Sequence, residues 1–297
     1  MKAGVVLLNG ERTLVMPRGS DWINVTRAAQ DYEKHVEGRD AAPLRDVGDL
    51  VEQGLFNRSF YRRVLEFVQR NGRLAEYTLA ELPPFQLPWR PRKVVCIGRN
   101  YRAHVKELGH DLPPEPMFFG KVSSACIATE QPIIIKDWYG RVDHEGELGV
   151  VIGKRAKNVA AEDAQAYVAG YTLVNDVTAR EMQKRDIEAR NPWFRSKNLD
   201  TFCPVGPTVV MAEVLSWPLR EPVELRVNGE VRQKGNTEMF IFDLPQLIAA
   251  VTRFITLEPG DLLATGTPEG VSPLKPGDLV ELSHPEIGTL RNPVVAG

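Results

Sequence analysis

The spacing of apolar residues divides the chain into two regions with different patterns. In the first region, two short apolar runs flank Asn9-Gly10, and apolar residues then recur every three or four residues, which predicts a β-hairpin followed by helices. The predicted elements are a hairpin over residues 5–16 and helices over residues 26–36, 46–53 and 59–71. Four prolines at positions 83, 84, 88 and 91 interrupt this pattern, so we place a domain boundary after residue 91.

From residue 93 onward, short apolar runs alternate with turn residues, which is typical of β-strands. We predict strands over residues 93–97, 133–135, 147–152 and 171–175, and a hairpin over residues 223–231 that turns at Asn228-Gly229. Helical spacing predicts helices over residues 161–169 and 244–255, and a short helical segment that ends at Gly109. The chain is therefore expected to be α+β and mostly β, with a small N-terminal α/β domain over residues 1–91 and a second domain over residues 92–297.

Two glutamates begin the apolar strand near residue 147, which is an unusual place for carboxylates. Glu145 and Glu147 are two residues apart, so on a strand their side chains lie on the same face. Two such carboxylates repel each other and lose hydration unless a cation, a shared proton or a basic side chain compensates. A hard divalent cation such as Mg²⁺ prefers these oxygen ligands. The alternative, from these residues alone, is a strand end with two solvated glutamates.

A second polar pair lies in the short helical segment before Gly109. His104 and Glu107 are three residues apart, so they lie on one face of the predicted helix. A carboxylate in this position can orient an imidazole for proton transfer, but the same spacing is also common in ordinary surface pairs.

Composition and missing motifs exclude several classes of function. The net charge of −2, with 43% hydrophobic and 26% charged residues, gives no argument for binding nucleic acid or membranes. No apolar run is long enough for a signal peptide or a membrane span, so we expect a cytoplasmic protein. The three cysteines (Cys96, Cys126 and Cys203) are odd in number and widely spaced, which argues against disulfides and zinc. The chain also lacks the GxGxxG motif of dehydrogenases and the Gly-x-Ser-x-Gly motif of α/β-hydrolases, which argues against both classes.

Several short motifs follow one another in the second region. They are Gly98-Arg99-Asn100-Tyr101 with His104-x-x-Glu107, Phe119 to Lys121, Glu145-x-Glu147, Asn175-Asp176-Val177-Thr178-Ala179-Arg180, Lys197 with Asp200-Thr201-Phe202, Gly206-Pro207, and Thr265-Gly266-Thr267-Pro268 with Gly270. Their order and content resemble the fumarylacetoacetate hydrolase family over about residues 93–297. Residues 1–91 are similar to the variable N-terminal domain that some members carry. The resemblance implies a mixed β-roll fold and, because members are usually dimers, a homodimer.

The resemblance also implies a role for each matching residue. Glu145, Glu147 and Asp176 would bind Mg²⁺ or Mn²⁺ and leave the other coordination positions to water and substrate. The residues that would be catalytic are His104, Glu107 and Lys197, the first two as part of a lid over the substrate and the third beside the ion. The residues that would contact the substrate are Arg99, Tyr101, Lys121, Arg180, Gln183 and Thr267.

Three positions depart from the family's usual pattern. Gly120 and Val122 flank Lys121 where members often have a bulkier residue and a proline. Asn198 follows Lys197 where a serine or glycine is more usual. None of these differences affects an expected metal ligand.

The substrate implied by the resemblance is a 2-oxo or 2,4-dioxo acid, which can chelate the metal through its carboxylate and 2-oxo oxygen. Chelation lowers the cost of forming an enolate at C3. We favour hydrolysis of the C3–C4 bond of an acylpyruvate or fumarylpyruvate, in which His104 activates water. The His104–Glu107 pair favours this reaction because a simple tautomer shift needs no activated water. The alternatives are an oxaloacetate decarboxylase or tautomerase, an isomerase of a 2-hydroxy-diene-dioate in aromatic catabolism, and a non-catalytic ligand-binding member.

Overall fold

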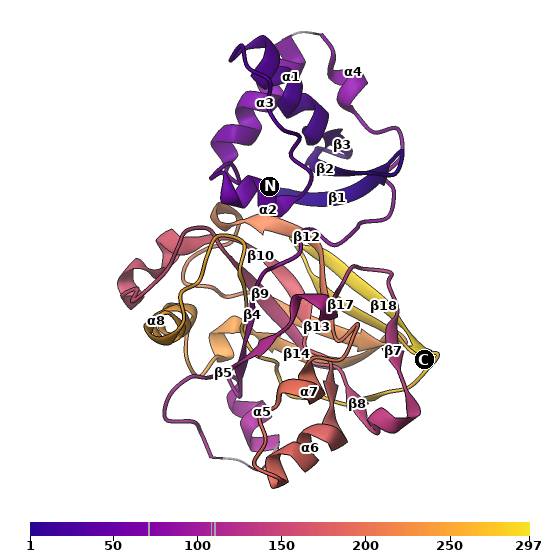
Figure 1. Cartoon of the computed structure of the whole chain (residues 1–297), viewed down its shortest axis with the longest axis vertical. Coiled ribbons are helices and arrows are strands. Elements are labelled where there is room, and N and C mark those ends of the chain that lie inside the picture. Colours follow the sequence, from indigo (N-terminus) through magenta and orange to yellow (C-terminus); the bar gives the residue numbers. More distant parts are fainter. Residues whose placement is uncertain (71, 108, 110) are drawn as a thin grey trace.

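The computed structural model describes residues 1–70, 72–107, 109 and 111–297 (Figure 1). Asn71, the predicted last residue of the helix over residues 59–71, lies outside these residues, as does Leu108 in the segment predicted to end at Gly109. In the described part of the chain, every helix is too short or too polar to cross a membrane.

The N-terminal region forms the unit at the top of Figure 1. Its elements are β1 (Lys2–Leu8), β2 (Glu11–Arg18), β3 (Asp21–Asn24), α1 (Val25–His35), α2 (Val47–Glu52), α3 (Arg58–Arg70) and α4 (Leu74–Tyr77). The strands β1 and β2 form the predicted hairpin, and Asn9 adopts the left-handed conformation that its tight turn requires, with a φ of 53°. Helix α1 begins one residue before the predicted helix because Asn24 is its N-cap and accepts a hydrogen bond from Arg27 N.

The rest of the chain is mainly β-structure. Its strands are β4 (Val94–Gly98), β5 (Met117–Lys121), β6 (Cys126–Ile127), β7 (Ile133–Ile135), β8 (Val142–Asp143), β9 (Gly146–Ile152), β10 (Val168–Asn175), β11 (Thr178–Ala179), β12 (Cys203–Met211), β13 (Pro222–Val227), β14 (Glu230–Asn236), β15 (Leu262–Ala264), β16 (Pro273–Leu274), β17 (Leu279–His284) and β18 (Gly288–Ala296). Its α-helices are α5 (Arg102–Glu107), α6 (Arg180–Glu188), α7 (Phe194–Lys197) and α8 (Leu244–Phe254). Its 3₁₀ helices are η1 (Ser123–Ala125), η2 (Asp137–Tyr139), η3 (Ala161–Tyr167), η4 (Ala212–Val214) and η5 (Thr237–Met239).

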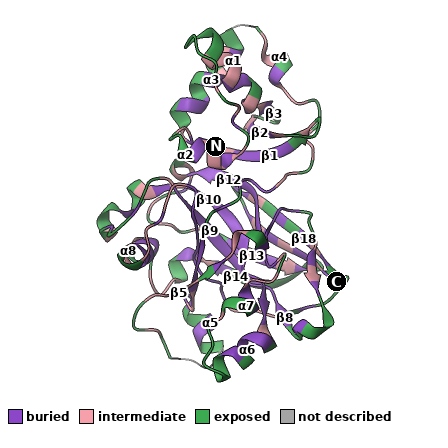
Figure 2. Cartoon of the chain, in the orientation of Figure 1, coloured by how far each residue is buried: buried purple, intermediate pink, exposed green. Residues whose placement is uncertain are grey.

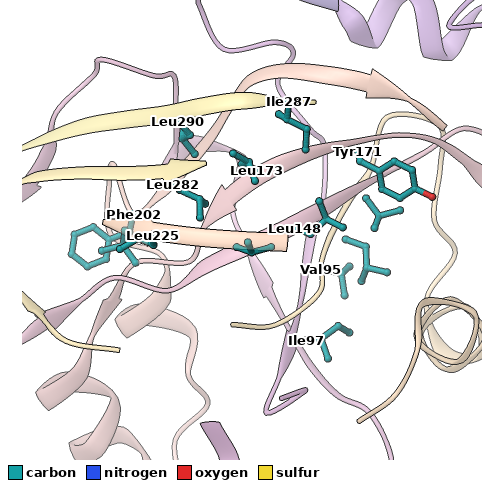
Figure 3. Close-up of a cluster of buried hydrophobic side chains, with 14 of the residues drawn as sticks. Val95, Ile97, Leu148, Tyr171, Leu173, Phe202, Leu225, Leu282, Ile287 and Leu290 are labelled. Carbon is teal, nitrogen blue, oxygen red and sulfur yellow. The ribbon is translucent and has the colours of Figure 1, made fainter. Parts of the chain in front are cut away.

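Two sheets pack against each other and bury the main core. The larger sheet runs in the order β3-β2-β1-β12-β10-β9-β15-β4-β5, with β6 beside β12, and the second runs β14-β13-β17-β18-β7. Between them, Leu148 and Leu173 of the larger sheet belong to the same apolar cluster as Leu225 and Leu282 of the second (Figure 3). The buried residues follow the strands through the centre of the body, whereas the exposed ones gather on helices and loops (Figure 2). The expected α+β, mostly β fold is therefore confirmed.

The N-terminal region also contributes to the larger sheet. Strand β1 pairs with β12 in antiparallel register, Lys2 opposite Val210, so hydrogen bonding continues from one region into the other. In the proline-rich segment between them, Trp89 Nε1 donates a 2.7 Å hydrogen bond to Gly260 O. Removal of residues 1–91 would therefore expose an edge of β12. The domain boundary after residue 91 stays a prediction.

Residues 161–169 and strand β12 are two of the places where the body differs from the sequence prediction. Residues 161–169, predicted as a helix, form the 3₁₀ helix η3 only to Tyr167, because Val168 already pairs with Ile152 of β9. Strand β12 was not predicted, since Pro204 and Pro207 are typical of a segment that interrupts a sheet. All nine of its residues are nevertheless buried, and it lies between β1 and β10.

Candidate active site

Three carboxylates meet at one end of two central strands. Glu147 lies in β9, Glu145 directly precedes β9, and Asp176 directly follows β10. The two strands are antiparallel, with Gly146 opposite Asn175, so the start of β9 and the end of β10 lie at the same edge. All three carboxylates are buried, and one oxygen from each lies within 4.8 Å of those from the other two.

Three basic side chains pair with two of these carboxylates. Lys197 Nζ, at the end of α7, donates to Glu145 Oε2 at 2.7 Å and to Asp176 Oδ2 at 2.6 Å. Lys121 Nζ, at the end of β5, donates to Asp176 Oδ1 at 2.7 Å. Arg180, which begins α6, donates from Nη2 to Glu145 Oε1. This pairing offsets much of the cost of burying the charges.

The surroundings shift the pKa values of Glu145 and Glu147 in opposite directions. Burial alone would raise the pKa of Glu145, but the charges of Lys197 and Arg180 outweigh burial and hold this pKa well below its usual value. Burial, together with the charges of Asp176 and Glu145, raises the pKa of Glu147 well above its usual value. Glu147 Oε2 accepts a 2.8 Å hydrogen bond from Gly266 N, but no lysine or arginine pairs with Glu147 among the described residues.

This set of donors fits a hard divalent cation. It consists entirely of carboxylate oxygens, which Mg²⁺ and Mn²⁺ prefer, and the oxygens are close enough to share one ion. Glu147, which has no basic partner in the described structure, is the ligand whose burial a bound cation would compensate most. The alternative of two solvated glutamates does not apply, because Glu145 and Glu147 are 5% and 2% exposed.

The three carboxylates line a cavity of about 610 Å³. The predicted site residues in its wall are Arg99, His104, Glu145, Glu147, Asp176, Arg180, Gln183, Lys197 and Thr267. The rest of the wall includes Phe119 and Trp193, whose rings pack edge to face with centroids 5.7 Å apart. Lys197 Nζ lies 4.9 Å from the centroid of the Phe119 ring, so the apolar side of the cavity reaches the carboxylates.

The predicted pair in α5 is formed. His104 Nδ1 lies 3.1 Å from Glu107 Oε2, and the Glu107 carboxylate also accepts a hydrogen bond from Gly270 N at 3.2 Å. Because the carboxylate accepts, Nδ1 carries the proton, and the lone pair of Nε2 is left for another group. His104 is 5% exposed and lines the cavity, so the pair is not an ordinary surface pair.

Two predicted substrate contacts, Tyr101 and Lys121, lie behind the cavity wall. Lys121 is buried, and besides Asp176 its ammonium donates to the carbonyl oxygens of Val177 and Lys197. Tyr101 is also buried, packs edge to face on Phe240 with centroids 5.0 Å apart, and has a pKa raised by burial. In this structure both residues support the wall, and their contact with substrate stays a prediction.

Arg99 is the cation of the cavity wall that lacks a carboxylate partner in the described structure. It has a left-handed backbone with a φ of 58°, and its guanidinium lies 5.9 Å from the centroid of the Trp193 ring. Burial lowers the pKa of Arg99. An anionic group in the cavity would compensate this partly buried charge.

The three departures from the family pattern lie together. Asn198 Oδ1 accepts a hydrogen bond from Val122 N, and its Nδ2 donates to Gly120 O at 3.1 Å and to Phe194 O at 2.7 Å. A proline at position 122 would have no N–H to donate, so Asn198 and Val122 suit each other. The asparagine thus ties the strand that ends in Lys121 to the helix that ends in Lys197.

Sequence reasoning missed the polar residues behind the carboxylates. Asp143 accepts hydrogen bonds from Arg141 and Arg180, at 2.7 and 2.8 Å, and so orients Arg180. His144 and Gln233 are buried and bonded to each other at 2.9 Å. His144 could have been found, because it directly precedes Glu145. Gln233 gave no signal, since a polar residue in an alternating strand normally faces solvent.

Comparisons with known proteins agree with this geometry. The model of the "Fumarylacetoacetate (FAA) hydrolase C-terminal" family matches residues 93–295. The mitochondrial oxaloacetate tautomerase FAHD2A of Homo sapiens is 43% identical over 260 residues, which cover 84% of this chain and 80% of that protein. The oxaloacetate tautomerase YisK of Bacillus subtilis is 42% identical over 231 residues, which cover 73% of this chain and 75% of that protein.

The whole fold is also similar to a solved structure. The fumarylacetoacetate hydrolase of Exiguobacterium antarcticum superimposes with a TM-score of 0.81 and 30% sequence identity, and the match covers 100% of both chains. The resemblance inferred from the motifs is thereby confirmed. Because the family model matches more than half of the chain and the fold agrees over its full length, the protein belongs to the fumarylacetoacetate hydrolase family.

Proposed function

We propose that this protein is a divalent-metal-dependent enzyme that interconverts the keto and enol forms of oxaloacetate or a closely related 2-oxo diacid. The observation that carries the proposal is that one cavity brings together the acidic triad, the His104–Glu107 pair and an arginine without a carboxylate partner among the described residues. Two relatives at 42% and 43% identity are named oxaloacetate tautomerases, which supports this substrate class.

The metal would be held by Glu145, Glu147 and Asp176, and Mg²⁺ or Mn²⁺ suits these ligands. When bound, such an ion supplies a Lewis acid that favours negative charge on the 2-oxo oxygen of a chelating 2-oxo acid. Lys197, which contacts Glu145 and Asp176, adds a fixed positive charge beside the same part of the cavity. Burial alone would lower the pKa of Lys197, but Asp176 and Glu145 raise it, so the side chain stays protonated.

His104 is the group in our proposal that moves the proton at C3. Glu107 holds the ring so that Nδ1 is protonated and Nε2 can accept a proton from the C3 methylene of the keto form. The same nitrogen returns the proton to C3 in the reverse direction, and the enolate oxygen exchanges its own proton with water. The Glu107 carboxylate does not need to take up the proton, because its role is to fix the tautomer and the orientation of the ring.

The far end of the diacid is assigned to the basic side of the cavity. Arg99 is available for a second carboxylate, and a guanidinium can bind one with two parallel hydrogen bonds. Arg180 is already bonded to Asp143 and Glu145, and its Nη1 donates to Gln183 Oε1 at 2.7 Å. We therefore infer that Arg180 orients the Gln183 amide, which leaves its NH₂ group free to contact the substrate.

Hydrolysis of the C–C bond of an acylpyruvate is the second candidate. It is favoured by the His104–Glu107 pair, because a carboxylate-oriented imidazole can activate water as well as accept a C3 proton. The similarity to a structure named fumarylacetoacetate hydrolase agrees with this reading. Decarboxylation of oxaloacetate and isomerisation of a 2-hydroxy-diene-dioate would pass through a related enolate. The cytoplasmic location and the homodimer stay predictions.

The two candidates are separated by measuring both reactions on the same Mg²⁺-loaded protein. Keto–enol exchange of oxaloacetate is followed by ultraviolet absorbance, and pyruvate release from a panel of acylpyruvates is followed by a coupled assay. We expect accelerated keto–enol exchange and little pyruvate. Fast pyruvate release without accelerated exchange would show that the protein is a hydrolase and not a tautomerase.

A further inference from the structure

Gln233 connects the second sheet to the edge of the larger sheet where the carboxylates lie. It is 1% exposed, and its side chain leaves β14 and makes four hydrogen bonds. Its Oε1 accepts from Gly146 N at 3.0 Å and from His144 Nδ1 at 2.9 Å. Its Nε2 donates to Thr267 Oγ1 at 2.7 Å and to Pro268 O at 2.8 Å.

The orientation of this amide follows from its partners. A backbone N–H can only donate and a carbonyl can only accept, so Oε1 must face Gly146 and Nε2 must face Pro268. All the hydrogen-bonding capacity of the Nε2 group is therefore used by Thr267 and Pro268. One buried side chain thus fixes the position of the loop at residues 266–270 relative to the start of β9.

Packing holds the loop in the same place. A Cβ atom at Gly235, two residues after Gln233 in β14, would lie 2.8 Å from Cβ of Pro268. The absence of a side chain at position 235 therefore lets the loop approach β14 closely enough for Gln233 to reach it.

The hydrogen bonds of Thr267 decide which of its groups can bind a ligand. Its hydroxyl donates to Gly146 O at 3.0 Å and accepts from Gln233, so its single proton is already engaged. Its neighbour Gly266 donates its N–H to Glu147 Oε2. The N–H of Thr267 has no acceptor in the described structure, although Thr267 lines the cavity.

We propose that Gln233 is a positioning residue that holds the loop against β9, so that the backbone N–H of Thr267, and not its hydroxyl, binds the substrate carboxylate next to the 2-oxo group. This inference rests on the proposed function only in that the ligand is a 2-oxo acid. The N–H of a loop held at two points by one buried amide keeps its direction without reorganisation when the anion arrives. The Gln233 amide also couples the loop to the start of β9, beside Glu145 and Glu147.

The test uses oxalate, the simplest anion with two adjacent carboxylates, and the Mn²⁺-loaded full-length protein. Gln233→Met keeps the length of the side chain but removes all four hydrogen bonds. We expect it to weaken oxalate binding by about tenfold, the usual effect of one misplaced hydrogen bond to a charged group. Thr267→Val keeps the backbone N–H and one of the two hydrogen bonds by which Gln233 holds the loop, the one to Pro268 O, so it should weaken oxalate binding by less than Gln233→Met does.

The double variant and a matched control separate positioning from general stability. Gln233→Met with Thr267→Val should bind oxalate only slightly more weakly than Gln233→Met alone, because the Gln233–Thr267 hydrogen bond is already absent and only the bond from the Thr267 hydroxyl to Gly146 O is lost in addition. Asn292→Leu removes a similar buried amide from β18 of the same sheet, where it donates to Ala128 O and Gln131 O. It should lower the melting temperature and leave oxalate binding and KM unchanged.

Two measurements decide the test: the affinity for oxalate by calorimetry, and the separate changes in KM and kcat from steady-state kinetics. We expect Gln233→Met to raise KM more than it lowers kcat. Parent-like oxalate affinity in Gln233→Met, or a larger loss in Thr267→Val than in Gln233→Met, would overturn the inference, as would a parent protein that binds no oxalate. A parent that binds Mn²⁺ and oxalate but catalyses no keto–enol exchange would instead overturn the proposed function.

Discussion

The rear wall of the cavity and its mouth are built differently. We define the rear wall as Glu145, Glu147, Asp176 and Lys197 together with Lys121, which supports them from behind, and all five are buried and lie on, or next to, strands or helix α7. The mouth consists of Arg99, His104 and Glu107, which lie on and before the six-residue helix α5. There the Glu107 side chain is 39% exposed.

The difference concerns which part of the site can move. Within the rear wall, each ion pair is buried and shares a member with another pair, so one side chain cannot shift without leaving a charge unpaired. From helix α5, Glu107 reaches the opposite loop by accepting a hydrogen bond from Gly270 N at 3.2 Å. We infer that the wall is preorganised for an ion, whereas the mouth can open to admit substrate.

The largest effect is expected from the rear wall. Glu147→Gln and Asp176→Asn should each abolish turnover, because each removes a carboxylate ligand. Their stabilities should differ. Asp176→Asn leaves Lys121 and Lys197 short of a buried counter-charge, which costs about 3–5 kcal/mol, whereas Glu147→Gln unpairs no cation. Calorimetry with Mg²⁺ and denaturant unfolding of the metal-free proteins measure both quantities. Equal stability of the two variants would show that the ion pairs of the wall contribute little.

A smaller effect is expected at the mouth. His104→Ala should lower turnover by about 10²–10⁴, the usual loss when a general base is removed. Mg²⁺ affinity should not change, because no ligand of the rear wall contacts the substituted side chain through a hydrogen bond. The measurement pairs steady-state kinetics with metal titration on one preparation. If His104→Ala turned over at the parent rate, the His104–Glu107 pair would have only a structural role.

Glu107→Gln should have an intermediate effect. The amide keeps the length of the side chain, but it is a weaker acceptor for Nδ1–H and for Gly270 N–H, so the imidazole is less well oriented. We expect a loss of about tenfold, which corresponds to one weakened charge-assisted hydrogen bond. Kinetics on this variant and on His104→Ala should rank parent, Glu107→Gln and His104→Ala in that order. If Glu107→Gln were as impaired as His104→Ala, the Glu107 carboxylate would have a further role.

The smallest effect concerns the motion of α5. Amide hydrogen exchange in residues 102–107 should slow when oxalate and Mg²⁺ are added together, since the helix then closes over an occupied cavity. Exchange in β9, which is buried along its whole length, should hardly change. Mass spectrometry of exchanged peptides compares the two segments in one experiment. Equal protection of both would remove the distinction between wall and mouth.

The two glutamates of the rear wall could be predicted from sequence because their signal is local. Glu145 and Glu147 interrupt the start of an apolar strand, and a two-residue spacing fixes their common face. Asp176 joins them only through strand pairing, and it was found from the family's motifs and not from spacing. Gln233 could not be predicted, because its partners Gly146 and Thr267 are 87 and 34 residues away. Strand β12 was missed for a related reason, since its prolines are tolerated only in the context of its neighbours in the sheet.

In our proposal, keto–enol exchange depends on a metal ion that the rear wall binds. The most direct measurement is the rate of oxaloacetate keto–enol exchange with protein treated with a chelator, then with Mg²⁺ restored, for the parent and for Glu147→Gln. We predict that the parent loses its activity with the metal and regains it on addition of Mg²⁺, and that Glu147→Gln stays inactive under both conditions. Exchange at the parent rate by the metal-free protein, or by Glu147→Gln, would contradict the account.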